Sequence, residues 1–198
     1  MDEREVRLAE LRASLARVEG VGPWPRVPLG HAAADACLEG GLRRGAVHEV
    51  FADAGHDAAA TAFVALLCRR VGAQRPVFWI RPDFSAAECG ELAAEGWLEL
   101  GLDPARLLLL RVADIVGLLR AGHDALACGG LGAVVMECPG APKSLTLAAS
   151  QRLALDSARM GVTAFFLRLN ASPQASAAET RWHVRALPSP GRGTGWGT

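Results

Sequence analysis

Apolar residues along the chain form short runs that alternate with longer amphipathic segments. Five runs are continuous enough to be buried strands, at 47–51, 76–80, 107–112, 131–136 and 162–169. Amphipathic helices are predicted at 58–70, 85–98, 114–128 and 145–160, and a final segment, 180–187, alternates like a strand. Strands and helices that alternate over short links predict an α/β fold, with a mostly parallel β-sheet flanked by helices.

The first twenty residues are set apart from this alternation. Leu8, Leu11 and Leu15 lie along one face of a predicted helix at 2–19, and a Gly/Pro segment follows it. We therefore expect three parts: an N-terminal helix (1–20), a core (26–187) and a disordered Gly/Pro-rich tail (188–198). The helix could dock on its own domain, on a second copy of the chain or on a partner protein.

The segment 47–70 has the strand, loop and helix order of a phosphate-binding P-loop, G-x-x-x-x-G-K-[ST]. A phosphate would meet a carboxylate here instead of a lysine, and Lys143 is the only lysine in the chain. We therefore predict no nucleotide cofactor and no ATPase activity. The loop keeps Asp53 and Gly55, and the four chemical positions of the motif are occupied by Ala52, Asp57, Ala58 and Ala59.

Two other interpretations of this segment stay open. Asp57 is also a good N-cap for the helix after it, so the segment can be an ordinary capped strand-loop-helix. Alternatively, Arg43 or Arg44 could replace the lysine in an unorthodox nucleotide site.

Two further acidic residues follow strands at the edge where ligands of parallel sheets bind. Asp83 comes after the second strand, where we favour a capping or turn role, and Ser85 with Glu88 has the spacing of a capping box. Glu137 ends the fourth strand, where a carboxylate could reach Mg²⁺. Since no hydroxyl partner stands in the loop and the five cysteines form no Cys/His ligand cluster, we predict no metal site.

The overall charge is balanced, with 21 basic and 21 acidic side chains. This balance argues against a polyanion binder that works by bulk charge, although it permits a local basic patch. The chain has no signal-peptide pattern, and no apolar run approaches the ~20 residues of a membrane span, so we expect a cytoplasmic protein.

The segment that leads into the first strand resembles the one that precedes the P-loop in RecA-like proteins. It has Gly30, Asp35, Leu38, Gly40, Gly41, Leu42, Gly45, Glu49 and Val50 at matching spacing. Together with FADAGHDAAATAF, GLDPARLLLLRV, LTLAASQRLAL and TRWHV, it resembles the ImuA family of RecA-like, SulA-like bacterial proteins.

This resemblance implies a RecA-like fold and a non-catalytic role in SOS-induced error-prone translesion DNA synthesis. The implied partners are ImuB, which is a relative of Y-family polymerases, an error-prone DNA polymerase and RecA. An SOS cell-division inhibitor of the SulA type, which binds a tubulin-like division protein, is the alternative.

The resemblance also locates two DNA-facing loops, at 139–146 and 170–180. The candidate DNA contacts are Lys143 in the first, and Arg168, Arg181 and Trp182 flanking the second, since arginine contacts phosphates and tryptophan stacks on bases. The alternative, which we favour, is that the two arginines form salt bridges and that Trp182 belongs to the core.

Overall fold

The computed structural model describes residues 24–72 and 74–188 of the 198-residue chain. The predicted helix that carries Leu8, Leu11 and Leu15 lies outside these residues, as does the predicted tail beyond 188.

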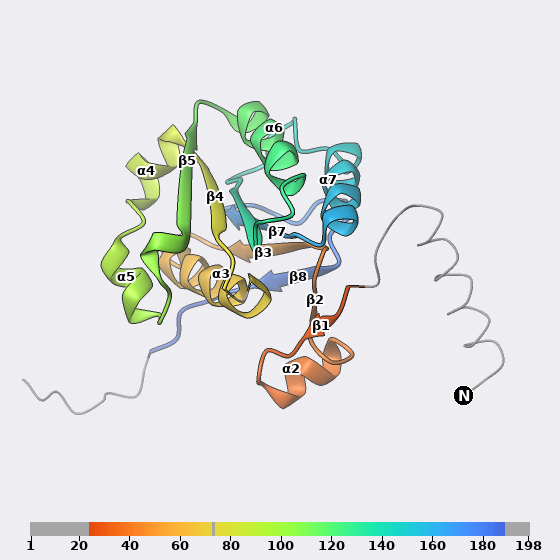
Figure 1. The fold of residues 1–198 in the computed structure, drawn as a ribbon. Helices are drawn as coiled ribbons and strands as arrows, with labels where there is room; N and C mark the ends of the chain where they lie inside the picture. Colours follow the sequence, from red (N-terminus) through yellow and green to blue (C-terminus); the bar gives the residue numbers. More distant parts are fainter. Residues whose placement is uncertain (1–23, 73, 189–198) are drawn as a thin grey trace, which may run out of the picture.

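A six-stranded sheet forms the middle of the described chain (Figure 1). Every pair of neighbouring strands in it is parallel. In spatial order the strands are β5 (Leu107–Val112), β4 (Val77–Pro82), β6 (Ala133–Glu137), β7 (Thr163–Leu169), β3 (Val47–Ala52) and β8 (Thr180–His183). The predicted α/β fold with a mostly parallel sheet is thus confirmed.

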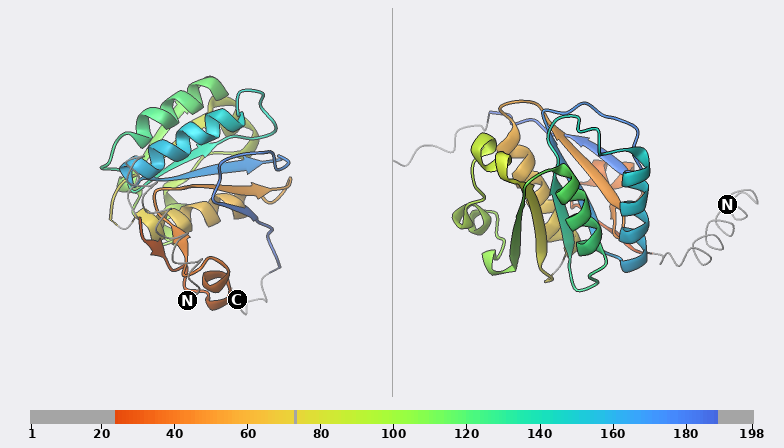
Figure 2. Two further views of the ribbon diagram at one scale, coloured as in Figure 1. Left: turned by 90° about the vertical axis from the view of Figure 1, so that its right-hand side faces the viewer. Right: turned by 90° about the horizontal axis from the view of Figure 1, so that it is seen from above.

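Helices cover both faces of this sheet (Figure 2). One face carries α3 (Asp57–Gly72), and the other carries α6 (Ile115–Leu126) and α7 (Leu147–Met160). All residues of β3, β6 and β7 are buried, because these strands are sandwiched between the two helical layers. The apolar runs of the sequence are therefore explained by burial on both faces.

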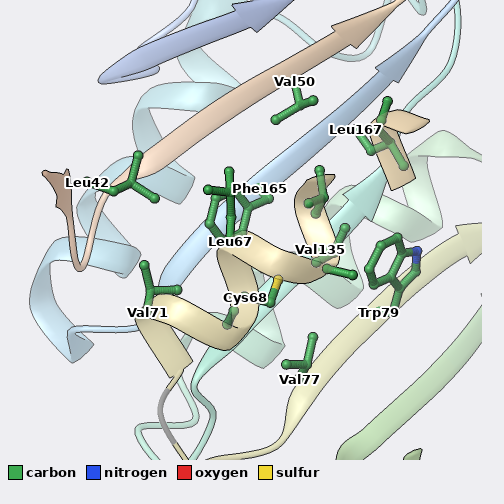
Figure 3. Packing of buried hydrophobic residues seen from close by; sticks show 14 of the residues in the cluster. Leu42, Val50, Leu67, Cys68, Val71, Val77, Trp79, Val135, Phe165 and Leu167 are labelled. Atoms are coloured by element: carbon green, nitrogen blue, oxygen red, sulfur yellow. The ribbon is translucent and has the colours of Figure 1, made fainter. Parts of the chain in front are cut away.

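Figure 3 shows the core between α3 and the sheet. Leu67, Cys68 and Val71 of the helix point at strand residues that include Phe165 and Trp79. Trp79 packs edge-on against Trp97, with 5.8 Å between the ring centroids. Since Trp97 belongs to α5 (Ala94–Glu99), this contact anchors that short helix beside α3.

The predicted helix at 85–98 is wrong, because the segment forms two helices. The first is α4 (Asp83–Cys89), and it ends at Gly90, whose φ of 78° favours glycine. Ser85 is buried inside α4 and does not cap it, so the predicted capping box is also wrong. The break leaves residues 90–93 as a link between α4 and α5.

The lead-in segment forms a small unit of its own. It contains β1 (Arg26–Val27), α2 (Ala32–Cys37) and β2 (Leu42–Arg43), and the two strands pair antiparallel. Asp35 accepts hydrogen bonds from the backbone N–H groups of Leu29 (2.6 Å) and Gly30 (3.0 Å), which fixes the start of the unit. A single turn of 3₁₀ helix, Pro104–Arg106, precedes β5.

Gly41 in this unit is a testable position. Its φ is 125°, and an added Cβ would lie 2.2 Å from the carbonyl oxygen of Val27. Its neighbour Gly40 has a comparable φ of 108° with open space around it. We predict that Gly41→Ala lowers the free energy of unfolding by at least about 2 kcal/mol more than Gly40→Ala, as measured by urea denaturation. Equal losses for the two variants would contradict the backbone clash.

Candidate functional site

A cavity of about 370 Å³ lies at the carboxyl edge of the sheet. Its walls come from the first turns of α3, from the link and helix at 89–100, and from the ends of β4, β6 and β7. Such an edge is where parallel α/β sheets bind their ligands. Most of the wall is small or apolar, and the ionisable side chains in it are Asp57, Arg81, Cys89, Glu91, Glu99 and Glu137.

The P-loop-like segment forms one wall of this cavity. Ala52 is buried at the end of β3, Gly55 has a φ of 83°, and α3 begins at Asp57. Asp53 points elsewhere, since its carboxylate lies 3.7 Å from the Arg185 guanidinium. Asp57 and Ala58 line the cavity, so a carboxylate and a methyl group face it from the first turn of α3.

Asp57 is the first residue of α3 and not the residue before it, as the N-cap interpretation required. Its carboxylate still suits the positive end of the helix. However, its Oδ1 atom is buried and has no hydrogen-bond partner.

Glu137 and Arg81 form a buried ion pair at the back of the cavity. Each side chain is only 2–3% exposed, and Arg81 Nε lies 3.2 Å from Glu137 Oε2. Trp79 Nε1 donates a hydrogen bond to Glu137 Oε1 at 2.7 Å. Burial raises the pKa of the Glu137 carboxyl above its ordinary value, and the Arg81 guanidinium and the Trp79 hydrogen bond oppose that rise.

The alignment of this pair is poor. Arg81 Nε, Arg81 Nη1 and Glu137 Oε2 are all buried without a hydrogen-bond partner, although the charges are close. A second carboxylate, Glu91 Oε2, lies 3.6 Å from Arg81 Nη1, and Glu91 also pairs with Arg111. The single guanidinium in the wall is thus shared between two carboxylates.

The other residues considered for nucleotide chemistry lie away from the cavity. Asp83 is exposed as the first residue of α4 and does not line the cavity. The N-cap position belongs to Pro82 and no side chain caps this helix, so the predicted capping or turn role of Asp83 is wrong. Arg43 lies 3.0 Å from Glu179 in an ion pair, and neither Arg43 nor Arg44 lines the cavity. Within residues 24–72 and 74–188, no group of three or more His, Cys, Asp or Glu side chains could hold a metal ion.

Glu49 is the centre of a second buried network. It is 1% exposed, and its Oε2 atom accepts hydrogen bonds from Arg181 Nε (2.8 Å) and Ser176 Oγ (3.0 Å). Arg168, which is also 1% exposed, lies 3.6 Å from Glu49 Oε1 and donates to the Gly140 carbonyl at 2.9 Å. A guanidinium this deeply buried cannot contact a phosphate while the fold is intact.

The other candidate DNA contacts are more accessible. Lys143 is exposed in the loop between β6 and α7. Arg181 is partly exposed although it pairs with Glu49. Trp182 packs on Phe63 of α3, with 5.4 Å between the ring centroids, and its indole donates to Thr180 Oγ1. The structure therefore brings Arg168 and Arg181 together around Glu49, whereas Trp182 packs against α3 on the other face of the sheet and Lys143 lies in a separate loop.

Comparison with known proteins supplies the family. No protein-family model matches the chain. Protein ImuA of Caulobacter vibrioides, from strain NA1000/CB15N, is 32% identical over 183 residues, which cover 84% of this chain and 71% of ImuA. ImuA of Caulobacter vibrioides strain ATCC 19089 gives the same values.

The chain belongs to the ImuA family. Its fold is also similar to the crystal structure of SulA from Pseudomonas aeruginosa, with 22% identity and a TM-score of 0.46 over 62% of this chain and 97% of that one. The family assignment depends on the ImuA sequences alone. In the described part of this ImuA-family chain, no helix is long and apolar enough to span a membrane.

Sequence reasoning missed Arg81, the most buried charge at the cavity. A signal was present, since an arginine at the end of the apolar run PVFWIR has to find a carboxylate if the strand is central. Arg168 in FFLRL is the same kind of signal. Arg81 belongs to none of the motifs expected at that edge of the sheet.

The network around Glu49 predicts a stability effect. Glu49→Gln leaves Arg168 buried without a counter-charge, so the free energy of unfolding should fall by about 3 kcal/mol or more. Glu179→Gln removes the carboxylate that lies 3.0 Å from Arg43 in a more exposed pair, and should cost less than about 1 kcal/mol. Urea denaturation of the two variants measures both. A Glu49→Gln variant as stable as Glu179→Gln would contradict the importance of this buried charge pair.

Proposed function

We propose that this chain is a non-catalytic accessory protein of SOS-induced, error-prone translesion DNA synthesis. In this role it is an adaptor that brings ImuB together with an error-prone DNA polymerase, with RecA and DNA as further contacts. Family membership is the observation that carries the proposal, since 71% of the length of ImuA aligns with this chain. The protein would act in the cytoplasm, where the DNA is.

The chemistry of the cavity supports the absence of catalysis. Asp57 and Ala58 give the α3 N-terminus a negative charge and no cation, which disfavours a triphosphate. Glu137, at the position of a metal-binding carboxylate, already has the Arg81 guanidinium as counter-ion. We therefore infer that the fold serves to present binding surfaces to other proteins.

The proposed adaptor surfaces come from the sequence and, for the DNA contacts, from exposure in the structure. The predicted helix at 1–20, with Leu8, Leu11 and Leu15 on its apolar face, is the proposed docking element for ImuB or for a second copy. For direct DNA contact, Lys143 and Arg181 are the accessible candidates.

Nucleotide binding gives one test. We predict that ATP with Mg²⁺ leaves the thermal unfolding midpoint of the protein unchanged within about 1 °C, because no cation in the cavity is free to hold phosphate. A RecA-like ATPase with an intact P-loop is the positive control. A Mg²⁺-dependent rise of several degrees, or hydrolysis of ATP that Asp57→Asn or Glu137→Gln changes, would remove the proposal of a non-catalytic protein.

Partner capture gives the second test. The full chain, tagged and expressed in DNA-damaged cells, should recover ImuB, and the variant with Leu8, Leu11 and Leu15 changed to Ala should recover at least about tenfold less. A control variant changes Glu10, Ser14 and Arg17 to Ala, which alters the same segment without its apolar positions. Recovery of the tubulin-like division protein without ImuB would replace the adaptor role with SulA-type inhibition of cell division.

A further inference from the structure

The helical layer formed by α6 and α7 does not fully cover its side of the sheet. On this side α7 packs on β7 and β3, and α6 packs mainly on β6 and β4. The edge strand β5 lies beyond β4, at the border of α6. Leu108 of β5 is 46% exposed as a result. An apolar strand is therefore left partly uncovered at the end of the layer.

An apolar groove of about 420 Å³ lies between α6 and β5. Phe78 of β4 lines it together with Leu108 and Leu110 of β5. On the other side, α6 and the turn after it contribute small side chains, which include Ala121 and Cys128. Because these side chains project little, the groove has room for the larger side chains of an amphipathic helix packed beside α6.

The described chain begins close to this groove. The indole of Trp24 packs on Gly161, since a Cβ added to that glycine would lie 2.5 Å from the ring. Met160, the residue before Gly161, reaches towards α6, because its Cε atom lies 3.4 Å from the position of a Cβ on Gly129. Gly129 follows Cys128, which lines the groove. The chain therefore enters the fold two side-chain contacts away from the groove, at the amino edge of the sheet.

The chain before Trp24 is long enough to reach the groove and to cover it. Residues 1–23 lie outside the described part, and a helix is predicted at 2–19. The four residues at 20–23 can span about 13 Å, and neighbouring helices such as α6 and α7 lie about 8–10 Å apart. The predicted helix would be about 27 Å long, against about 18 Å for the 12 residues of α6.

The predicted helix also matches the groove in chemistry. Its leucines recur at the spacing of one helical face, as an apolar groove requires. Arg7 and Arg12 flank these leucines in the sequence, and the charged member of the groove lining is Asp124, which is exposed. Apolar side chains would thus meet apolar side chains, with opposite charges at the rim.

We propose that this groove binds the apolar face of the chain's own helix at 1–20, as a third helix beside α6 and α7. Leu8, Leu11 and Leu15 pack over Leu108 and remove it from water. A partner that binds the same three leucines must then displace the helix from the groove. That last step rests on the proposed adaptor role, whereas the docking itself does not.

The cysteines of the chain provide the test. Cys128 is exposed and lines the groove, so a docked helix should shield its thiol from reagents. Cys37 is also exposed and lies in α2, outside the groove lining, and it therefore serves as an internal reference. The measurement is the rate at which iodoacetamide alkylates each thiol of the purified full chain, followed by mass spectrometry of its peptides.

We expect the ratio of the Cys128 rate to the Cys37 rate to rise at least about tenfold when Leu8, Leu11 and Leu15 are changed to Ala. The reason is that a thiol covered for about nine-tenths of the time reacts only while the helix is undocked. The purified protein contains no ImuB, so this result is separate from the outcome of partner capture.

Two further variants separate the groove from the helix. Ala121→Glu places a charge in the groove without altering the helix, and it should raise the ratio by a similar factor. Changing Glu10, Ser14 and Arg17 to Ala is the matched control and should leave the ratio unchanged. Cys68, which is 0% exposed, should stay unreactive throughout, which shows that each variant is folded.

Two results would overturn the proposal. The first is a ratio that neither the three leucine substitutions nor Ala121→Glu raises, since the groove would then be uncovered in the unaltered chain. The second is protection of Cys128 that is lost on about a hundredfold dilution, because the helix of a second copy would then cover the groove. Protection that is independent of protein concentration supports docking within one chain.

Discussion

The need to neutralise charges inside a sheet covered on both faces shapes the carboxyl edge of this protein. Arg81 and Arg168 each come from a strand that is buried between helical layers, and each is 1–2% exposed. An unpaired guanidinium at such a depth is very costly, so each requires a carboxylate from a neighbouring strand. Glu137 on β6 meets Arg81 on β4, and Glu49 on β3 meets Arg168 on β7. The strand order of the sheet is what brings these partners together.

The two ion pairs differ in how many of their polar atoms have hydrogen-bond partners. The Glu49 pair has hydrogen bonds from Arg181 and Ser176 and to the Gly140 carbonyl, and only Arg168 Nε lacks a partner in it. The network ties β8 and the segment before it to the core. The Arg81 pair has three buried polar atoms without a hydrogen bond and borders a cavity. A well-satisfied buried network rigidifies a fold, whereas polar atoms that are buried without a hydrogen bond carry a cost in free energy. The first pair therefore belongs to stability and the second to the candidate site.

Sequence reasoning succeeded where the pattern is local. The strand runs and the helices at 114–128 and 145–160 were predicted because their apolar period is local, and the structure adds that Thr146 caps the second of these helices. The prediction was wrong between 85 and 98, because residues that favour helices lie on both sides of the break at Gly90. The link that follows this break lines one wall of the cavity. The ion pairs were not predicted, since they join residues 56 to 119 positions apart, and only the strand order makes them neighbours. The cavity depends on the break at Gly90 and on the Arg81–Glu137 ion pair, so its chemistry could not be predicted from sequence motifs.

The carboxylate of Glu137 shows why the fold of this chain does not by itself determine its function. At the end of a central parallel strand a carboxylate can hold a metal, act as a base or bind a cation, and the neighbours decide among these. Here a strand neighbour supplies a guanidinium, an indole supplies a hydrogen bond, and α3 begins with a second carboxylate. A metal with a triphosphate would add anions to a wall that already has an excess of them.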